Sequence, residues 1–284
     1  MNRYAIFKRD DNLKAKSWES KIKDFFQSSN YIEDEKNPEV VVVLGGDGTI
    51  VEGIMKFMPQ NPLFIGLNLG TVGFLASARD QKSFLPSLKK FVAGKYLESE
   101  RSVIESHLNC SDNLCTYTEP VEPSSGSFLA LNDIVIKNLT SVVELDIYLH
   151  NRKIQEIRGD GVLVSTSMGS TAYNLSNHGP ILMPNIKSFV MTEILDHNVP
   201  TPPIVFKSTE EIKIKVKNFR PFDDLVFKKT GESINVGLFV DGRLKAILKV
   251  GDEVLVRRAK QSIRLAEFSK NYFFDSVRNK FHFR

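Results

Sequence analysis

An apolar run that leads directly into a glycine-rich loop constrains the fold of this chain more than any other feature. Val40–Leu44 is continuously apolar and rich in valine, which is typical of a strand buried on both faces of a parallel sheet. Gly45–Thr49 (GGDGT) follows it without a break, and Ile50–Met58 has helical apolar spacing. Strand, glycine loop and helix in this order predict an open α/β sheet with a ligand beyond the carboxyl ends of its strands.

The first third of the chain alternates between strand and helix patterns. The strands are expected at Arg3–Lys8, Val40–Leu44 and Pro62–Leu67, and the helices at Asn12–Ser28, Ile50–Met58 and Gln81–Val92. Such alternation implies parallel strands with right-handed crossovers. We expect an α/β domain over residues 1–98. The aromatic-rich tail, residues 266–284, has helical spacing and is expected to pack back on it.

Short alternating segments replace this pattern after about residue 99. Strands are expected at Phe128–Lys137, Val142–His150, Lys153–Arg158, Gly161–Thr166, Glu211–Val216, Ser233–Val240 and Asp252–Val256, with one short helix over Ser170–His178. The predicted fold is therefore an α/β N-terminal domain with a parallel sheet, followed by a largely antiparallel β-rich C-terminal domain over residues 99–265.

Composition narrows the class of protein. The net charge is only +4 and the basic residues are dispersed, so we expect no nucleic-acid partner. No run approaches eighteen apolar residues, and Met1–Asp11 has no long apolar stretch, so we expect no membrane span, no signal peptide and a cytoplasmic location. Cys110 and Cys115 lack the further ligands of a zinc site and are expected to be reduced thiols.

The GGDGT loop has the chemistry of a phosphate site. Glycine allows close backbone approach, so that the amides of Gly45, Gly46 and Gly48 can surround an anion. Thr49 can cap the following helix or donate to a phosphate oxygen. Asp47 would repel phosphate, which implies a task for it: accepting a proton from an attacking hydroxyl, or helping to hold Mg²⁺. The alternative is a tight turn with Asp as its turn former.

Two other nucleotide-binding patterns are missing from the sequence. No G-x-x-x-x-G-K-[ST] occurs, and no G-x-G-x-x-G follows a strand, which weakens a dehydrogenase interpretation. GGDGT resembles the loop shared by NAD kinases, diacylglycerol kinases and sphingosine kinases, and in a looser form phosphofructokinases. By itself it does not identify the acceptor.

Two further segments bear on the acceptor. In Asn68–Leu75 (NLGTVGFL), Phe74 offers a ring on which adenine could stack; alternatively, Phe74 and Leu75 anchor the loop in the core. Asn132 and Asp133 are polar residues inside an apolar strand, where burial is costly without partners. The amide could pair with an adenine edge and the carboxylate with ribose hydroxyls, or the pair could mark a bulge or turn.

The longest pattern runs from Arg158 to Thr166 (RGDGVLVST) and continues from Ser167 to Ser176 (SMGSTAYNLS). A strand enters a loop of small hydroxyl residues and then a helix, which Ser170 or Thr171 is expected to cap. The hydroxyls could bind ribose and amide groups, or they could form a series of local turns and caps.

Taken together, these segments resemble the NAD kinase family of bacterial type, strongly over roughly residues 40–180. The resemblance implies a fold like that of NAD kinases and diacylglycerol kinases. It implies transfer of a phosphoryl group from ATP or polyphosphate to the 2′-hydroxyl of the adenosine ribose of NAD, which makes NADP. Mg²⁺ would accompany the donor without a protein metal site, and a homodimer or homotetramer would share its sites across subunits.

The resemblance also assigns residues. Asp47 would be catalytic, and Gly45, Gly46, Gly48 and Thr49 would bind phosphate. NAD would be bound by Phe74, Asn132, Asp133, Arg158, Asp160, Thr171, Ala172, Tyr173 and Ser176. The chain departs from the family pattern at Met168 and at Asn177–His178. Two alternatives remain: a lipid kinase, which would not need Asn132 and Asp133, and a non-catalytic NAD(H) sensor, for which Met168 is the only hint.

Overall fold

The chain forms two compact units in the computed structural model, which describes residues 2–70, 73–112, 114–118, 126–138, 140–197, 201–219 and 236–282. Unit 1 comprises residues 1–101 and 262–284, and unit 2 comprises residues 102–261. The expected domain boundaries were 98/99 and 265/266. The units divide at 101/102 and 261/262, within strands β5 (Leu97–Asn109) and β16 (Glu253–Glu267).

Unit 1 contains a parallel sheet and its covering helices. Its remaining elements are β1 (Arg3–Lys8), α1 (Leu13–Ser28), β2 (Ile32–Glu33), β3 (Val40–Gly45), α2 (Asp47–Phe57), the 3₁₀ turn Met58–Gln60, β4 (Leu63–Asn68), the 3₁₀ turn Gln81–Ser83, α3 (Phe84–Val92) and α5 (Tyr272–Phe281). The strand order is β2-β1-β3-β4-β16, and β4 pairs in parallel with β16 at Arg264 and Leu265.

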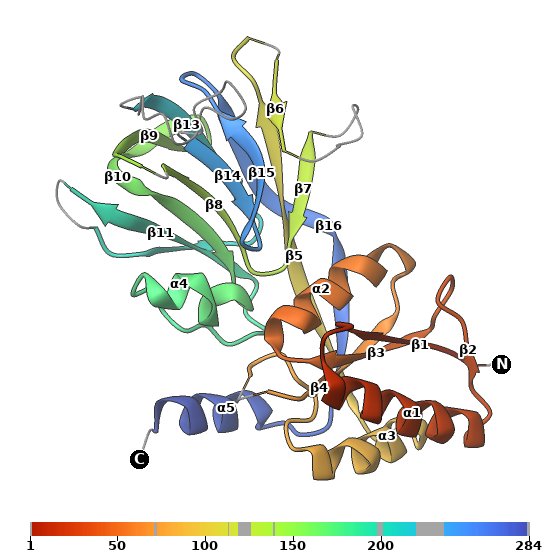
Figure 1. Ribbon diagram of the computed structural model, residues 1–284. Coiled ribbons are helices and arrows are strands. Elements are labelled where there is room, and N and C mark those ends of the chain that lie inside the picture. The colour runs from red at the N-terminus through yellow and green to blue at the C-terminus, as the bar shows by residue number, and fades with distance from the viewer. Residues whose placement is uncertain are drawn as a thin grey trace. The chain divides into compact units, whose positions relative to one another are not determined.

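Helices cover both faces of this sheet (Figure 1). On one face, Ile22 and Phe26 of α1 and Phe84 of α3 join a buried cluster with Val42 and Ile65. On the other face lies α2, whose Gly53 is close to the side chains of Phe7 and Val43. Burial on both faces is the physical reason that β3 is uniformly apolar.

The GGDGT loop is shorter than its sequence pattern suggested. Gly45 ends β3, Gly46 is the N-cap, and α2 begins at Asp47, three residues before the expected start. The expected cap is also wrong: Thr49 lies inside the helix, and the cap has no side-chain hydrogen bond. The tight connection brings the carboxylate of Asp47 into the first turn of α2.

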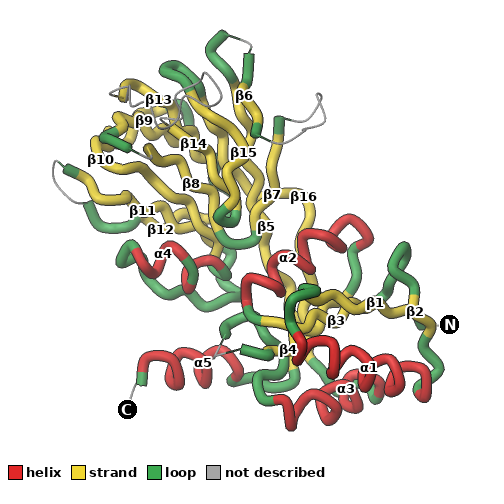
Figure 2. The backbone as a smooth tube through the Cα atoms, in the orientation of Figure 1, coloured by secondary structure: helices red, strands yellow, loops and turns green. Residues whose placement is uncertain are grey.

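Unit 2 is a largely antiparallel sheet (Figure 2). Its further elements are β6 (Thr116–Tyr117), β7 (Ser127–Ala130), β8 (Asp133–Asn138), β9 (Val143–Leu149), β10 (Arg152–Thr166), the 3₁₀ turn Gly169–Thr171, α4 (Tyr173–Ser176), β11 (Ser188–Asp196), β12 (Ile204–Lys207), β13 (Ile212–Phe219), β14 (Val236–Val240) and β15 (Arg243–Leu248). One path through the sheet follows β16-β13-β9-β10-β8-β14-β15-β6, and β11 pairs with β10 and β12.

Two expectations for unit 2 are wrong in detail. The strand predicted over Phe128–Lys137 is two strands, β7 and β8, because a bend at Leu131 and Asn132 interrupts it. The strands predicted at Lys153–Arg158 and Gly161–Thr166 form one strand, β10, which pairs first with β9 and then with β8 and β11. Residues 233–235 of the predicted Ser233–Val240 strand lie outside the described residues.

The cysteines also differ from expectation. Cys110 and Cys115 are joined by a disulfide rather than being free thiols, and no described cysteine is unpaired. Both pack against the main core of unit 2, near the turn between β5 and β6. The sequence could not show this pairing, because the distance between the two sulfurs depends on how that turn folds.

The tail forms helix α5 within unit 1, in line with its helical spacing. Its Ser276 donates a hydrogen bond to the carbonyl of Gly73, at 3.3 Å. None of the helices within the described residues has the length and apolar character needed to cross a membrane.

Candidate functional site

Asp47 uses both oxygens of its carboxylate to hold the segment that follows β4. Its Oδ2 accepts from the amide of Phe74 at 2.8 Å, and its Oδ1 accepts from the amide of Leu75 at 3.2 Å. Each carboxylate oxygen has two lone-pair positions, so each can still accept one further hydrogen bond. The residue can therefore hold this loop and bind a substrate hydroxyl at the same time.

Gly73 lies directly against this carboxylate. A methyl group on residue 73 would lie 2.3 Å from Oδ1 of Asp47, so any side chain there would displace the carboxylate. The second glycine of the Asn68–Leu75 segment is thus explained by close approach rather than by a turn. Thr71 and Val72 of the same segment lie outside the described residues.

Phe74 is buried, with 3% of its surface exposed. Its ring centroid lies 5.9 Å from that of Phe273 and 6.4 Å from that of Phe281, both on α5, and Lys280 Nζ is 4.7 Å from the ring centre. The ring therefore anchors its loop against α5, as the second interpretation of this residue expected. Its proposed contact with adenine stays a prediction.

The bend between β7 and β8 holds the two polar residues that the sequence places in the acceptor site. One carboxylate fixes it: Asp241 accepts from the amides of Leu131, Asn132 and Asp133 at 2.9, 2.7 and 3.2 Å. Asp241 also donates its own amide to the carbonyl of Asp133 at 3.0 Å. The bend is thus a defined structure and not a local irregularity of one strand.

The carbonyls of the same bend are bound from β10. Thr166 donates its amide to the carbonyl of Asn132 at 2.9 Å and its hydroxyl to the carbonyl of Leu131 at 2.6 Å. Gly169 packs on the backbone here, because a methyl group at that position would lie 2.1 Å from the carbonyl oxygen of Asn132. The predicted Asn132 and the predicted hydroxyl-rich segment therefore meet within unit 2.

Asp133 is 4% exposed, at the start of β8. Burial, and then the negative charge of Asp241, raises the pKa of Asp133 to about 7. Burial also raises the pKa of Asp241, and hydrogen bonds from three backbone amides offset only part of that rise. At a pH near 7 Asp133 is therefore partly protonated, and its protonated form can donate a hydrogen bond as well as accept one.

The hydroxyl-rich segment folds into two short turns instead of one helix. A 3₁₀ turn over Gly169–Thr171 precedes the single helical turn α4. Ser170 and Thr171 do not cap it: their hydroxyls donate to the carbonyls of Ser167 and Met168, at 2.7 and 3.2 Å. The predicted cap is wrong because both side chains close the preceding turn.

The remaining predicted contacts lie nearby in unit 2. Thr171, Ala172 and Tyr173 are half-buried, Ser176 is exposed, and Tyr173 packs beside the small cluster of Val135, Leu163 and Ile194. Arg158 is exposed and lies 3.7 Å from Glu144, and Asp160 lies 3.9 Å from the ring nitrogen of His197. Their roles toward NAD stay predictions.

Asp241 is the main residue that the site assignment from sequence left out. It occupies the two-residue turn between β14 and β15, with positive φ at both Asp241 and Gly242. An Asp-Gly pair between two apolar strands is an ordinary hairpin signal. Nothing in that signal says that the carboxylate reaches the bend at Leu131–Asp133, more than one hundred residues earlier.

Comparison with known proteins finds one family model in the N-terminal part of the chain and another in the C-terminal part. The family model for the ATP-NAD kinase N-terminal domain matches residues 5–96, and that for the C-terminal domain matches residues 131–268. The NAD kinase of Lachnoclostridium phytofermentans is 30% identical over 248 residues, which are 87% of this chain and 81% of the relative. The NAD kinase of Lachnospira eligens is 31% identical over 247 residues, with 86% and 80% covered.

The chain belongs to the ATP-NAD kinase family. Solved structures share its fold. Yeast NADH kinase complexed with NADH superposes with a TM-score of 0.84 at 22% identity, over 100% of this chain and 88% of the other. An NAD kinase from Archaeoglobus fulgidus in complex with ATP has a TM-score of 0.72 at 22% identity, over 98% and 99%.

Family membership confirms the resemblance seen in the sequence and the fold class that it implied. It places the chain among kinases that phosphorylate a dinucleotide. It does not favour the lipid kinase, which shares only the GGDGT loop with this chain.

Proposed function

We propose that this chain transfers a phosphoryl group from ATP to the 2′-hydroxyl of the adenosine ribose of NAD, which yields NADP. The observation that carries the proposal is the position of Asp47. Its carboxylate lies in the first turn of α2, directly beyond the carboxyl end of a buried parallel strand, among glycines. Ligands of open α/β sheets bind at such a strand end, and a helix N-terminus favours phosphate.

The geometry of unit 2 supports the acceptor side of this proposal. The backbone of Asn132 is fixed on both sides, because its amide donates to Asp241 and its carbonyl accepts from Thr166. Its side-chain amide group therefore extends from a fixed backbone position from which it can bind an adenine edge. Protonated Asp133 can donate to a ribose oxygen, and the deprotonated form can accept from a ribose hydroxyl. Thr171, Ala172 and Tyr173 would line the rest of the dinucleotide site.

Phosphoryl transfer requires chiefly positioning and charge neutralisation. Asp47 would align the attacking hydroxyl and take its proton, and the amides of Gly46 and Gly48 would bind the transferred phosphoryl group. Within the described residues, no group of three or more His, Cys, Asp or Glu side chains could hold a metal ion. Mg²⁺ does not need such a group, because it is usually bound by substrate phosphates, water and one or two carboxylates. Bound in this way, it would neutralise the charge of the donor.

Three finer features belong to the same proposal. Polyphosphate would replace ATP as donor if the loop binds the phosphate chain and not the base. Two or four copies would share their sites, with Asp160 and Arg158 reaching the dinucleotide of a neighbouring copy. The location would be the cytoplasm, where NAD and ATP are available.

A coupled assay tests the proposal directly. The purified chain is incubated with ATP, Mg²⁺ and NAD, and NADP is detected with an NADP-specific dehydrogenase. NADP formation that requires all three components supports the proposal. Binding of NAD without any NADP would instead identify a non-catalytic sensor, and phosphorylation of a lipid alcohol without NADP formation would identify a lipid kinase.

A further inference from the structure

Helix α5, in the tail of the chain, contacts the same segment that Asp47 holds. The hydroxyl of Ser276 donates to the carbonyl of Gly73 at 3.3 Å and shares its proton with the carbonyl of Tyr272 at 3.0 Å. Asp47 accepts from the amide of Phe74 at 2.8 Å. The carbonyl of Gly73 and the amide of Phe74 belong to one peptide group, which is planar and rigid. Within unit 1, a single peptide group is therefore bound by α5 at its C=O and by Asp47 at its N–H.

The ring of Phe74 makes a second contact with α5. It packs against the rings of Phe273 and Phe281, and Lys280 Nζ lies 4.7 Å from its centre. The ring separations of 5.9 and 6.4 Å lie in the range at which aromatic pairs attract each other. Because Phe74 and Phe273 are both buried, this contact fixes the position of the loop relative to the helix.

Arg79 joins the far end of the segment to the same helix. Its guanidinium donates to the carbonyl of Tyr272, and its Cζ lies 5.4 Å from the centre of that ring. The hydroxyl of Tyr272 accepts in turn from Arg101 at 2.9 Å. Burial lowers the pKa of Arg79, whereas the charges of nearby groups, Asp47 among them, raise it. Residues 73–79 are therefore bound to α5 at both ends, and within electrostatic reach of Asp47.

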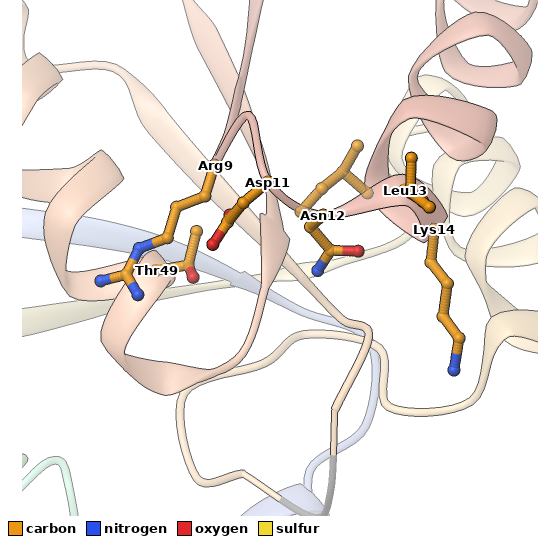
Figure 3. Close-up of a pocket in the computed structure, with 7 residues that line it drawn as sticks. Arg9, Asp11, Asn12, Leu13, Lys14 and Thr49 are labelled. Atoms are coloured by element: carbon orange, nitrogen blue, oxygen red, sulfur yellow. The ribbon is translucent and has the colours of Figure 1, made fainter.

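The first turn of α2 has two sides, and residues 73–79 lie on one of them. Thr49 lines a pocket together with Arg9 and Asn12 of the β1–α1 connection (Figure 3). In the sheet, β3 lies between β1 and β4, so the segment that follows β4 flanks α2 on the other side. The contacts of α5 with that segment therefore bear on Asp47 and not on Thr49.

We propose that α5 positions the catalytic carboxylate, with Phe273 and Ser276 as positioning residues that act through the loop of Gly73 and Phe74. Each oxygen of Asp47 uses one lone-pair position for this loop and has one left for the acceptor. The place of the loop therefore sets the direction in which the remaining positions point. A shift of α5 turns them away from the attacking hydroxyl without removing the carboxylate. The inference rests on the proposed function, and it adds an element remote in sequence that turnover requires.

Hydrogen exchange tests the contact without any turnover. The amides that donate to Asp47, those of Phe74 and Leu75, are followed by NMR. The chains compared are the original, Phe273→Leu and Phe274→Leu. Phe274 is the matched control, because it lies on the same helix with 58% of its surface exposed.

Both exchange rates are expressed relative to that of the Val42 amide in the buried strand β3, which removes any change in overall stability. We expect the two loop amides to exchange about tenfold faster in Phe273→Leu. In Phe274→Leu the rates should stay unchanged. Unchanged ratios in Phe273→Leu, or equal rises in both variants, would overturn the inference.

A double-mutant cycle on turnover tests whether α5 acts through Asp47. We measure kcat for Phe273→Leu and Ser276→Ala, first in the original chain and then in the Asp47→Asn background. In the original chain kcat should fall by about tenfold and about threefold, while the KM values for ATP and NAD change by less than about twofold. In the Asp47→Asn background both substitutions should leave kcat unchanged, because the group that they position is already lost. Equal losses in the two backgrounds would show that α5 supports only the fold, and would overturn the inference.

The two experiments separate this inference from the proposed function. If no NADP forms, the proposed function fails, and the exchange of the two loop amides alone decides whether α5 positions Asp47. If NADP forms and Phe273→Leu leaves kcat unchanged, the inference is overturned and the proposed function stands.

Discussion

In each of the two units, one carboxylate holds a loop by accepting hydrogen bonds from its backbone amides. In unit 1, Asp47 accepts from the amides of Phe74 and Leu75. In unit 2, Asp241 accepts from the amides of Leu131, Asn132 and Asp133. In unit 1 the carboxylate that holds the loop is itself the predicted catalytic residue. In unit 2 the carboxylate is not a predicted binding residue but holds the backbone of two residues that are.

This difference changes how substitutions are interpreted. Removing Asp47 removes a reactive group and a structural clamp together, so lost activity alone does not establish chemistry. Removing Asp241 loosens a bend and leaves the predicted contacts Asn132 and Asp133 in the chain. The three predictions below separate clamping from chemistry, beginning with the largest effect.

Asp47→Asn should have the largest effect. The asparagine keeps one accepting oxygen, but its NH₂ group faces a backbone amide that also donates. We expect kcat to fall by about 10³-fold, because the attacking hydroxyl loses its proton acceptor, while the Kd for NAD changes little. Steady-state kinetics and NAD titration measure the two quantities, and thermal unfolding reports any loosening of the loop.

Gly73→Ala is the control for the clamp in unit 1. It pushes on the carboxylate from the loop side and leaves the carboxylate itself intact. Its kcat should fall much less than that of Asp47→Asn. Equal losses in the two variants would mean that clamping explains the whole effect, and a near-normal rate in Asp47→Asn would refute the catalytic role.

Asp241→Ala should affect stability and acceptor binding more than turnover. It leaves three backbone amides of the bend without their acceptor, at a cost of about 2–4 kcal/mol in the free energy of unfolding. The KM for NAD should rise while kcat changes less, since Asp47 is untouched. Urea unfolding and NAD saturation curves provide the test.

The conservative variant Asp241→Asn sharpens this prediction. Its single carbonyl oxygen can still accept from the amide of Asn132, so it should recover part of the affinity for NAD. If Asp241→Ala lowered stability but left the KM for NAD unchanged, the bend would support the fold without positioning the site.

Asp133→Asn should have the smallest effect, and one that depends on pH. The pKa of Asp133 is raised to about 7, so the folded chain holds this proton more tightly than the unfolded chain does. Its contribution to stability is complete below the ordinary pKa of 3.8 and is lost as pH rises through about 7. The amide mimics the protonated form and has no such loss.

The measurement is the free energy of unfolding of both chains across this pH range. Relative to the original chain, Asp133→Asn should gain stability as pH rises from about 4 to about 7, and the difference should level off above that. A difference that does not vary with pH would show that Asp133 stays ionised in the fold.

The sequence alone determined the sheet class, the junction at Gly45–Thr49 and the family, because these depend on local pattern and on residues adjacent in the chain. Burial of β3 on both faces requires an apolar run, and a close approach to phosphate requires glycine. Such requirements determine which residue types stand at particular positions, so they can be recognised in the sequence.

Only the tertiary structure decided that Asp47 holds the Phe74 loop, that Asp241 holds the bend before β8, and that Cys110 meets Cys115. Each of these contacts joins residues whose distance depends on a turn or on long-range strand pairing. A carboxylate in a turn looks the same in sequence whether it faces water or three backbone amides. Its role, and with it the pKa of Asp133, follows from burial that only the folded chain creates.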